Sequence, residues 1–199
     1  MKKLSLACVF FLLFYKSLSA YTYSSDPQVF ITELVNEAIS KLADKNIDKD
    51  EKKEFIEKVA IENVDINALG LYTLGELRKS TEKDLLLKYQ ASFEKYFLKS
   101  LTSRLTDYSE NKFEVISADK KSVNYTIVKS KILENENQPE IKIDWRVYTK
   151  NPDKPLIRDL IVEGLSLART QKEEFSSILN SNDNDINILI SKLDEFVNN

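Results

Sequence analysis

Two carboxylates in the C-terminal half of the chain, Asp159 and Glu163, have the residue types and spacing that come nearest to an acid–base pair. They fall in an apolar run that alternates like a strand, with Ile161 between them on the same face. Residues two apart on a strand face are separated by about 7 Å, so these carboxylates lie roughly twice that distance apart. This is too far for a close acid–base pair. We therefore expect ion-paired or surface roles, with Arg146 and Arg158 as available partners.

Nucleophiles and metal ligands are scarce in this sequence. There is no histidine, and the single cysteine, Cys8, lies in an N-terminal segment with the features of a leader. The absence of histidine excludes Ser-His-Asp triads and the common zinc sites. Without Cys8, the chain has neither a disulfide nor a thiol nucleophile. The sequence therefore predicts a protein that is not an enzyme and that uses no cofactor and no metal ion.

The N-terminus has the three parts of a secretory signal peptide. Lys2 and Lys3 are basic, the apolar run from Leu6 to Tyr15 is too short to span a membrane, and small residues follow up to Ala20. We interpret residues 1–20 as a signal peptide that is cleaved near Ala20. Residues 21–199 then form a single exported domain, and the expected location is the periplasm.

Charge also restricts the partners of the exported domain. Removing the leader takes away three lysines and no acid, which leaves 26 basic and 32 acidic residues and a net charge of −6. No basic stripe stands out along the sequence, so we expect no nucleic-acid partner. The length suits one domain with a substantial core, and no internal repeat is present.

A central stretch from Ile141 to Phe175 organises the strands. In Ile141–Val147, apolar residues alternate with charged ones, which places the only tryptophan, Trp145, on the apolar face. A turn at Asn151–Pro155 separates this strand from a second one, and a helix then begins near Thr170. The predicted strands are Phe113–Ser117, Val123–Ile132, Ile141–Val147 and Leu156–Leu167.

Helical patterns occupy both ends of the chain. Asp26 and Pro27 indicate a helix start, a second helix covers about Asp50–Asn63, and Val64-Asp65-Ile66 opens a third. Ser80 and Thr81 are predicted to cap a long fourth helix, with Asp84 at capping-box spacing. A last helix runs from about Ile186 to Val197.

The long fourth helix carries a stripe of large apolar residues. Aromatic or leucine side chains recur at every fourth position: Tyr89, Phe93, Phe97, Leu101 and Leu105. Such a stripe is explained either by a large core packed against the sheet or by one wall of a ligand cavity. The spacing by itself favours the core.

Several short motifs together resemble the MlaC family, the periplasmic phospholipid-binding proteins that are also called toluene-tolerance or auxiliary transport proteins. They are Asp144-Trp145-Arg146, Asp159, Val162-Glu163-Gly164-Leu165-Ser166-Leu167, Thr170-Gln171 and Glu174-Phe175, preceded by Val64-Asp65-Ile66, Leu74-Gly75 and Asp107-Tyr108-Ser109. The resemblance extends from about Val64 to Leu193. It departs from the family pattern at Pro155, where a tryptophan is usual.

The resemblance implies an α+β fold in which a curved antiparallel sheet of about four strands is wrapped by several helices and encloses an apolar lipid cavity. It implies a carrier that shuttles phospholipid between an outer-membrane lipoprotein complex and an inner-membrane ABC lipid transporter complex, and so maintains outer-membrane lipid asymmetry. Together with the aromatic stripe and the apolar strand face, it gives the expected lipid-binding residues: Tyr72, Leu74, Phe93, Phe97, Leu101, Trp145, Val147, Val162 and Leu165.

Two alternatives remain open at this stage. The ligand is a hopanoid or another apolar molecule, or the exported protein is structural and binds no ligand. The mass of whatever extracts into chloroform from the purified protein distinguishes them, because only a carrier should retain lipid.

The leader yields the first testable prediction. N-terminal sequencing of the exported protein should begin near residue 21, because the three-part leader is removed on export. A protein recovered from the periplasm that still begins at Met1 would contradict this prediction.

Overall fold

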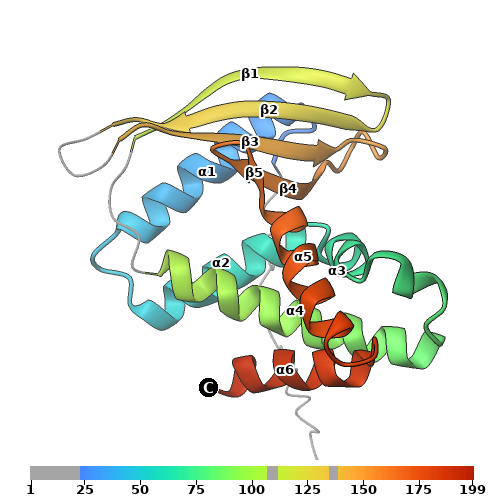
Figure 1. The fold of residues 1–199 in the computed structure, drawn as a ribbon. Helices are drawn as coiled ribbons and strands as arrows, with labels where there is room; N and C mark the ends of the chain where they lie inside the picture. Colours follow the sequence, from blue (N-terminus) through green and yellow to red (C-terminus); the bar gives the residue numbers. More distant parts are fainter. Residues whose placement is uncertain (1–22, 107–111, 135–138) are drawn as a thin grey trace, which may run out of the picture.

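The computed structural model describes residues 23–106, 112–134 and 139–199, which form six α-helices, one 3-10 helix and one five-stranded sheet (Figure 1). The predicted signal peptide and Asp107-Tyr108-Ser109 lie outside these residues. The helices are α1 (Pro27–Ala43), α2 (Lys49–Asn63), α3 (Ile66–Thr73), η1 (Gly75–Lys79), α4 (Lys83–Leu105), α5 (Leu167–Asn180) and α6 (Ile186–Asn198). The strands are β1 (Phe113–Ser122), β2 (Tyr125–Ile132), β3 (Ile141–Tyr148), β4 (Leu156–Val162) and β5 (Leu165–Ser166).

The sheet has the order β1-β2-β3-β4-β5, and every neighbouring pair is antiparallel. In Figure 1, α1 lies against one face of the sheet, and the other helices form a second layer beyond it. The predicted α+β class is confirmed. The sheet has five strands instead of about four, because the short strand β5 pairs with the end of β4.

The local capping signals place the starts of α1 and α3 where the sequence predicts them. The Asp26 side chain accepts hydrogen bonds from the backbone N–H groups of Gln28 and Val29, each at 3.0 Å. Asp65 does the same for Ala68 at 3.2 Å. An N-cap carboxylate satisfies donors that have no partner within the helix, so these short-range patterns survive in the folded chain.

The predicted cap of the fourth helix is wrong. Helix α4 begins at Lys83, and Glu82 occupies the N-cap position without a side-chain hydrogen bond. The hydroxyls of Ser80 and Thr81 turn back instead and donate to the Leu77 carbonyl, at 3.3 and 2.6 Å. They close the end of η1, because the last carbonyls of a helix also need partners.

The boundary between β4 and α5 also differs from the prediction. Strand β4 ends at Val162, and a turn follows in which Glu163 and Gly164 have φ angles of 49° and 81°. The predicted strand Leu156–Leu167 is therefore too long, because no strand continues through positive φ. Helix α5 starts before Thr170, at Leu167, with Ser166 as the N-cap whose Oγ accepts from the Arg169 N–H at 3.1 Å.

Two separate groups of buried apolar residues hold the layers together. The first, which we call the helical cluster, draws on α3 to α6 and contains Ile66, Leu74, Tyr89, Phe93, Phe175, Leu179, Ile186, Leu189 and Leu193. The second, the sheet cluster, joins α1 and α2 to the strands and contains Phe30, Ile31, Leu34, Val59, Val128, Val147 and Ile157. Val64 packs against both clusters, so the interior is two cores that meet near the start of α3.

Gly70 permits the closest approach in the helical cluster. A Cβ atom at this position would lie 2.9 Å from Cδ1 of the Phe93 ring. The nearby Thr73 hydroxyl donates to the Gly70 carbonyl at 2.7 Å, and it also shares a 2.7 Å hydrogen bond with the Tyr89 hydroxyl. Helices α3 and α4 therefore pack at a distance that only a residue without a side chain allows.

This contact predicts that Gly70→Ala destabilises the protein. Overpacking typically costs about 1–3 kcal/mol, and the better helix propensity of alanine offsets it by about 1 kcal/mol. The substitution should become neutral or stabilising in a Phe93→Leu background, where the ring is gone. Urea unfolding of the four proteins of this cycle measures the coupling, and the same loss of stability in both backgrounds would contradict the packing explanation.

Candidate functional site

The inner face of the sheet, against which α1 packs, carries three apolar residues on neighbouring strands that lead toward the edge of the sheet. We call Ile143, Val162 and Leu165 the apolar row. Ile143 lies opposite Ser130 on one side and Val162 on the other, and Val162 lies opposite Leu165. Directly opposed residues of an antiparallel pair point to the same face. Trp145 and Val147 share this face through the strand alternation.

Burial is greatest at the centre of the sheet and least at its edge. Ser130 is 1% exposed, Ile143 and Val162 are half-buried, and Leu165 is 69% exposed. Neither Ile143 nor Val162 belongs to the helical or the sheet cluster. The row is therefore apolar surface that begins in the covered centre of the sheet and ends uncovered beside the β4–β5 turn.

Polar atoms beside the row are bonded to one another. The Trp145 indole N–H donates to the Ser130 Oγ at 2.8 Å, and that hydroxyl donates to the Ile143 carbonyl at 2.8 Å. The Trp145 ring meets Phe113 edge to face, with the centroids 6.3 Å apart. Because these polar groups are satisfied within the sheet, the inner face offers an apolar ligand no unpaired donor here.

The stripe on α4 divides into two parts. Its N-terminal part is core: Phe93 contacts the rings of Tyr89, Tyr96, Phe97 and Phe175, with centroids 6.0 to 6.4 Å apart. Burial raises the pKa of the Tyr89 hydroxyl well above its ordinary value, so that side chain stays neutral.

The C-terminal part of the stripe has a different environment. Leu101 and Leu105 are half-buried and lie outside both clusters. Helix α4 packs chiefly on α6, α3 and α2. The core that its N-terminal part forms is thus made with other helices, in contrast to the core against the sheet that we considered from the sequence.

The structure distributes the predicted lipid-binding residues among four environments. Leu74, Phe93 and Phe97 belong to or pack on the helical cluster, and Trp145 and Val147 do so in the sheet cluster. Leu101 and Val162 are half-buried outside both, whereas Tyr72 and Leu165 are 42% and 69% exposed. The residues are therefore not gathered in one cluster, and a shared lipid cavity stays a prediction.

One contact between the layers is a half-buried polar cluster around Arg158. Its guanidinium donates to the Asp65 carboxylate at 2.8 Å and to the Tyr125 hydroxyl at 2.8 Å, and it stacks 3.4 Å from the Tyr148 ring centroid. Burial opposes the charge, but the bonds to Tyr125 and Asp65 prevail and raise the pKa of Arg158. Asp65 also donates its backbone N–H to the Ile157 carbonyl at 2.9 Å, so the start of α3 is fixed to β4.

A second polar contact attaches helix α5 to strand β4. The Asp159 carboxylate is buried, accepts from the Ser166 hydroxyl at 2.6 Å and from the Ala168 N–H at 3.0 Å, and lies 3.5 Å from Arg146. The expected ion pair with Arg146 is confirmed. A carboxylate beneath a helix N-terminus is favoured because the exposed N–H groups carry partial positive charge. Asp159 thus positions a helix, and Glu163 lies outside the strand in the following turn.

Comparison with protein families and solved structures supports the resemblance seen in the sequence. The family model described as MlaC protein matches residues 32–195. The chain belongs to the MlaC family. This is a family of non-enzymatic lipid-binding carriers, which confirms the prediction that the chain is not an enzyme.

The fold has a counterpart among solved structures. A phospholipid-binding protein from Ralstonia solanacearum, determined in complex with a phospholipid, superposes with a TM-score of 0.68 at 16% identity, over 84% of this chain and 94% of that one. No curated protein matches the chain.

The described ranges contain neither a membrane-spanning helix nor a candidate metal site. No helix there combines the length and hydropathy that crossing a bilayer requires. The same ranges contain no group of three or more histidine, cysteine, aspartate or glutamate side chains arranged to hold a metal ion.

The hydrogen bonds and ion pair of Asp159 predict that removing its charge lowers the stability of the protein. Asp159→Asn keeps the shape but weakens the bonds to Ser166, Ala168 and Arg146, so it should cost about 1–3 kcal/mol of unfolding free energy. Asp119→Asn is the matched control, because Asp119 pairs with Lys129 on the solvent-exposed side of the sheet and should matter little. Urea unfolding of both variants checks this, and equal effects would contradict the proposed anchoring role.

Proposed function

We propose that this protein is a periplasmic carrier that binds phospholipid by its acyl chains and shuttles it between an outer-membrane lipoprotein complex and an inner-membrane ABC transporter, in a system that maintains outer-membrane lipid asymmetry. The observation that carries the proposal is the apolar row Ile143–Val162–Leu165 on the inner face of the sheet, which is half-buried at Ile143 and Val162 and exposed at Leu165. Family membership and the phospholipid held by the similar Ralstonia protein support it.

The proposed acyl site lies between two walls. The first wall is the row itself, flanked by Trp145 of the sheet cluster. The second is the part of α4 beyond the helical cluster, around Leu101. Each methylene removed from water contributes about 0.8 kcal/mol, so a dozen buried methylenes contribute roughly 10 kcal/mol without any polar contact. The head group then stays near the solvent, where Leu165 ends the row.

Release of the lipid requires that the walls can separate. The helical and sheet clusters are distinct, and α3 and α5 are fixed to the sheet through β4. A carrier built from two cores loses less packing when its layers move apart than a carrier with one continuous core. This arrangement supports a function in which the protein binds its ligand and later releases it.

The proposal predicts that the purified protein carries lipid and that Leu165→Asp lowers its lipid content several-fold, because a charge at the open end of the row must be desolvated when a chain binds. Val123→Asp is the matched control, since Val123 is 82% exposed in the β1–β2 turn at the opposite end of the strands. Both positions are exposed, so the fold should tolerate both changes.

Native mass spectrometry and chloroform extraction measure the lipid in each sample, and thermal unfolding confirms that the variants are folded. The extracted mass also identifies the cargo as phospholipid or as a sterol-like hopanoid. A wild-type protein free of lipid, or equal losses in the two variants, would exclude the proposed site.

A second substitution tests the α4 wall. Leu101→Trp should reduce lipid content while the protein keeps its fold, because the larger side chain occupies space that acyl chains need. Full lipid content in this variant would remove Leu101 from the site.

A further inference from the structure

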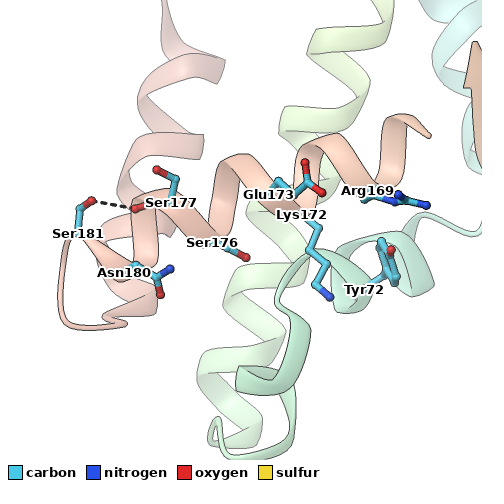
Figure 2. A pocket seen from close by; sticks show the side chains of 8 residues that line it. All are labelled: Tyr72, Arg169, Lys172, Glu173, Ser176, Ser177, Asn180 and Ser181. Atoms are coloured by element: carbon cyan, nitrogen blue, oxygen red, sulfur yellow. Dashed lines mark hydrogen bonds between the residues drawn. The ribbon is translucent and has the colours of Figure 1, made fainter. Parts of the chain in front are cut away.

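A polar groove of about 640 Å³ runs along α5, on the side that faces Tyr72 of α3 (Figure 2). Its lining consists of Tyr72, Arg169, Lys172, Glu173, Ser176, Ser177, Asn180 and Ser181. The buried side chains of α5, Phe175 and Leu179, belong to the helical cluster and do not line it. The groove is therefore separate from the apolar row on the sheet.

The two ends of the groove differ in chemistry. Figure 2 shows Arg169, Lys172 and Tyr72 grouped toward the start of α5, with Ser177, Asn180 and Ser181 toward its end. One end is cationic and aromatic, and the other offers hydroxyl and amide groups that both donate and accept.

Arg169 and Lys172 supply the positive charge at the first end of the groove. Among the described residues, neither Arg169 nor Lys172 forms an ion pair with a carboxylate. Glu173 also lines the groove, but Figure 2 shows its carboxylate directed away from the Lys172 ammonium. A surface charge without a partner keeps its full attraction for an incoming anion.

Lys172 is held in position by packing. Its Nζ lies 5.3 Å from the Tyr72 ring centroid, and its Cε would be 3.2 Å from a Cβ atom built on Gly75. The side chain therefore lies between an aromatic ring and a glycine backbone, which reduces the rotamer entropy that an anion would have to remove. The pKa of the Glu76 carboxyl is lowered, chiefly by Lys79 and to a smaller extent by Arg78 and Lys172, as expected for an electropositive neighbourhood.

The length of the groove defines the size of its ligand. Arg169 and Ser181 are twelve residues apart along α5, which corresponds to about 18 Å at the rise of an α-helix. A single phosphate or carboxylate covers only a small part of that length. An extended peptide advances about 3.3 Å per residue, so five or six residues match the groove.

We propose that this groove docks an acidic segment of another protein, five or six residues long, with carboxylates on Arg169 and Lys172 and its main chain over the serine and asparagine side chains. Tyr72 adds a half-exposed ring of the type enriched at protein interfaces. The rest of the exported domain carries a net negative charge, which repels an acidic segment from other surfaces and directs it to this groove. The proposal does not depend on lipid binding.

Fluorescence anisotropy with a fluorescein-labelled hexaglutamate peptide at low ionic strength tests the proposal on the leaderless chain. The wild-type protein should bind the peptide, and Arg169→Glu/Lys172→Glu should weaken binding at least tenfold. Lys150→Glu/Lys154→Glu is the matched control, because both lysines are exposed in the β3–β4 turn and the net charge changes equally. This control should stay within twofold of the wild type.

Tyr72→Ala removes the aromatic ring without changing the charge of the groove, and it should weaken peptide binding several-fold. Unfolding curves show that each variant is folded. Three results would overturn the proposal: no binding by the wild type, an equal loss in the Lys150/Lys154 control, or competition by inorganic phosphate at the same molar concentration as unlabelled peptide. A self-association that Arg169→Glu/Lys172→Glu abolishes would assign the groove to a second copy of this chain instead. The affinity for the peptide should be the same before and after lipid is extracted from the protein, because the groove is separate from the proposed lipid site.

Discussion

The structure depends on three consecutive residues of β4, which bond to the starts of helices α3 and α5. Ile157 accepts the Asp65 N–H and packs in the sheet cluster, Arg158 binds the Asp65 carboxylate, and Asp159 receives the N-terminus of α5. A buried carboxylate is tolerated only when its oxygens are hydrogen-bonded, as those of Asp159 are, and the half-buried Arg158 guanidinium is bonded to Asp65 and Tyr125. The helical layer is therefore attached to the sheet at defined points by polar contacts.

This mode of attachment explains why the interior contains two apolar clusters. The helices α3 to α6 bury their apolar faces largely against one another, and α1 covers part of the inner face of the sheet (Figure 1). Apolar residues that neither cluster absorbs, such as Val162 and Leu165, remain partly or fully accessible. In a globular protein without a ligand, an exposed apolar row of this kind favours aggregation. In the proposed lipid carrier, the same row is the surface that contacts the ligand.

Polar and apolar recognition occupy different faces of the C-terminal segment. The apolar row ends at Leu165, directly after the turn at Glu163 and Gly164. Ser166 then caps α5, whose outer face carries the cations of the polar groove. The buried face of the same helix belongs to the helical cluster through Phe175. One short segment thus connects the proposed lipid site, the core and the proposed docking groove, and Asp159 fixes its orientation.

Features that depend on near neighbours along the chain could be predicted from the amino-acid sequence. The Asp26 and Asp65 caps, the alternation in β3 and the periodicity of α4 arise from residues a few positions apart, and the motifs around Trp145 were sufficient for the family. The start of α5 was misplaced because an apolar run resembles a strand until positive φ angles interrupt it. Likewise, Ser80 and Thr81 looked like caps but bond backwards to η1.

The way in which these elements share their apolar surface depends on contacts between distant segments. The stripe on α4 is uniform in sequence, yet Phe93 is core and Leu101 lies outside both clusters. Arg158 and Asp65 are 93 positions apart, and no local pattern pairs them. The cations of the groove depend in the same way on α3 lying beside α5. Spacing along the chain determines which face a side chain occupies, but the contacts that cover or expose that face are made by distant segments and exist only once the chain has folded.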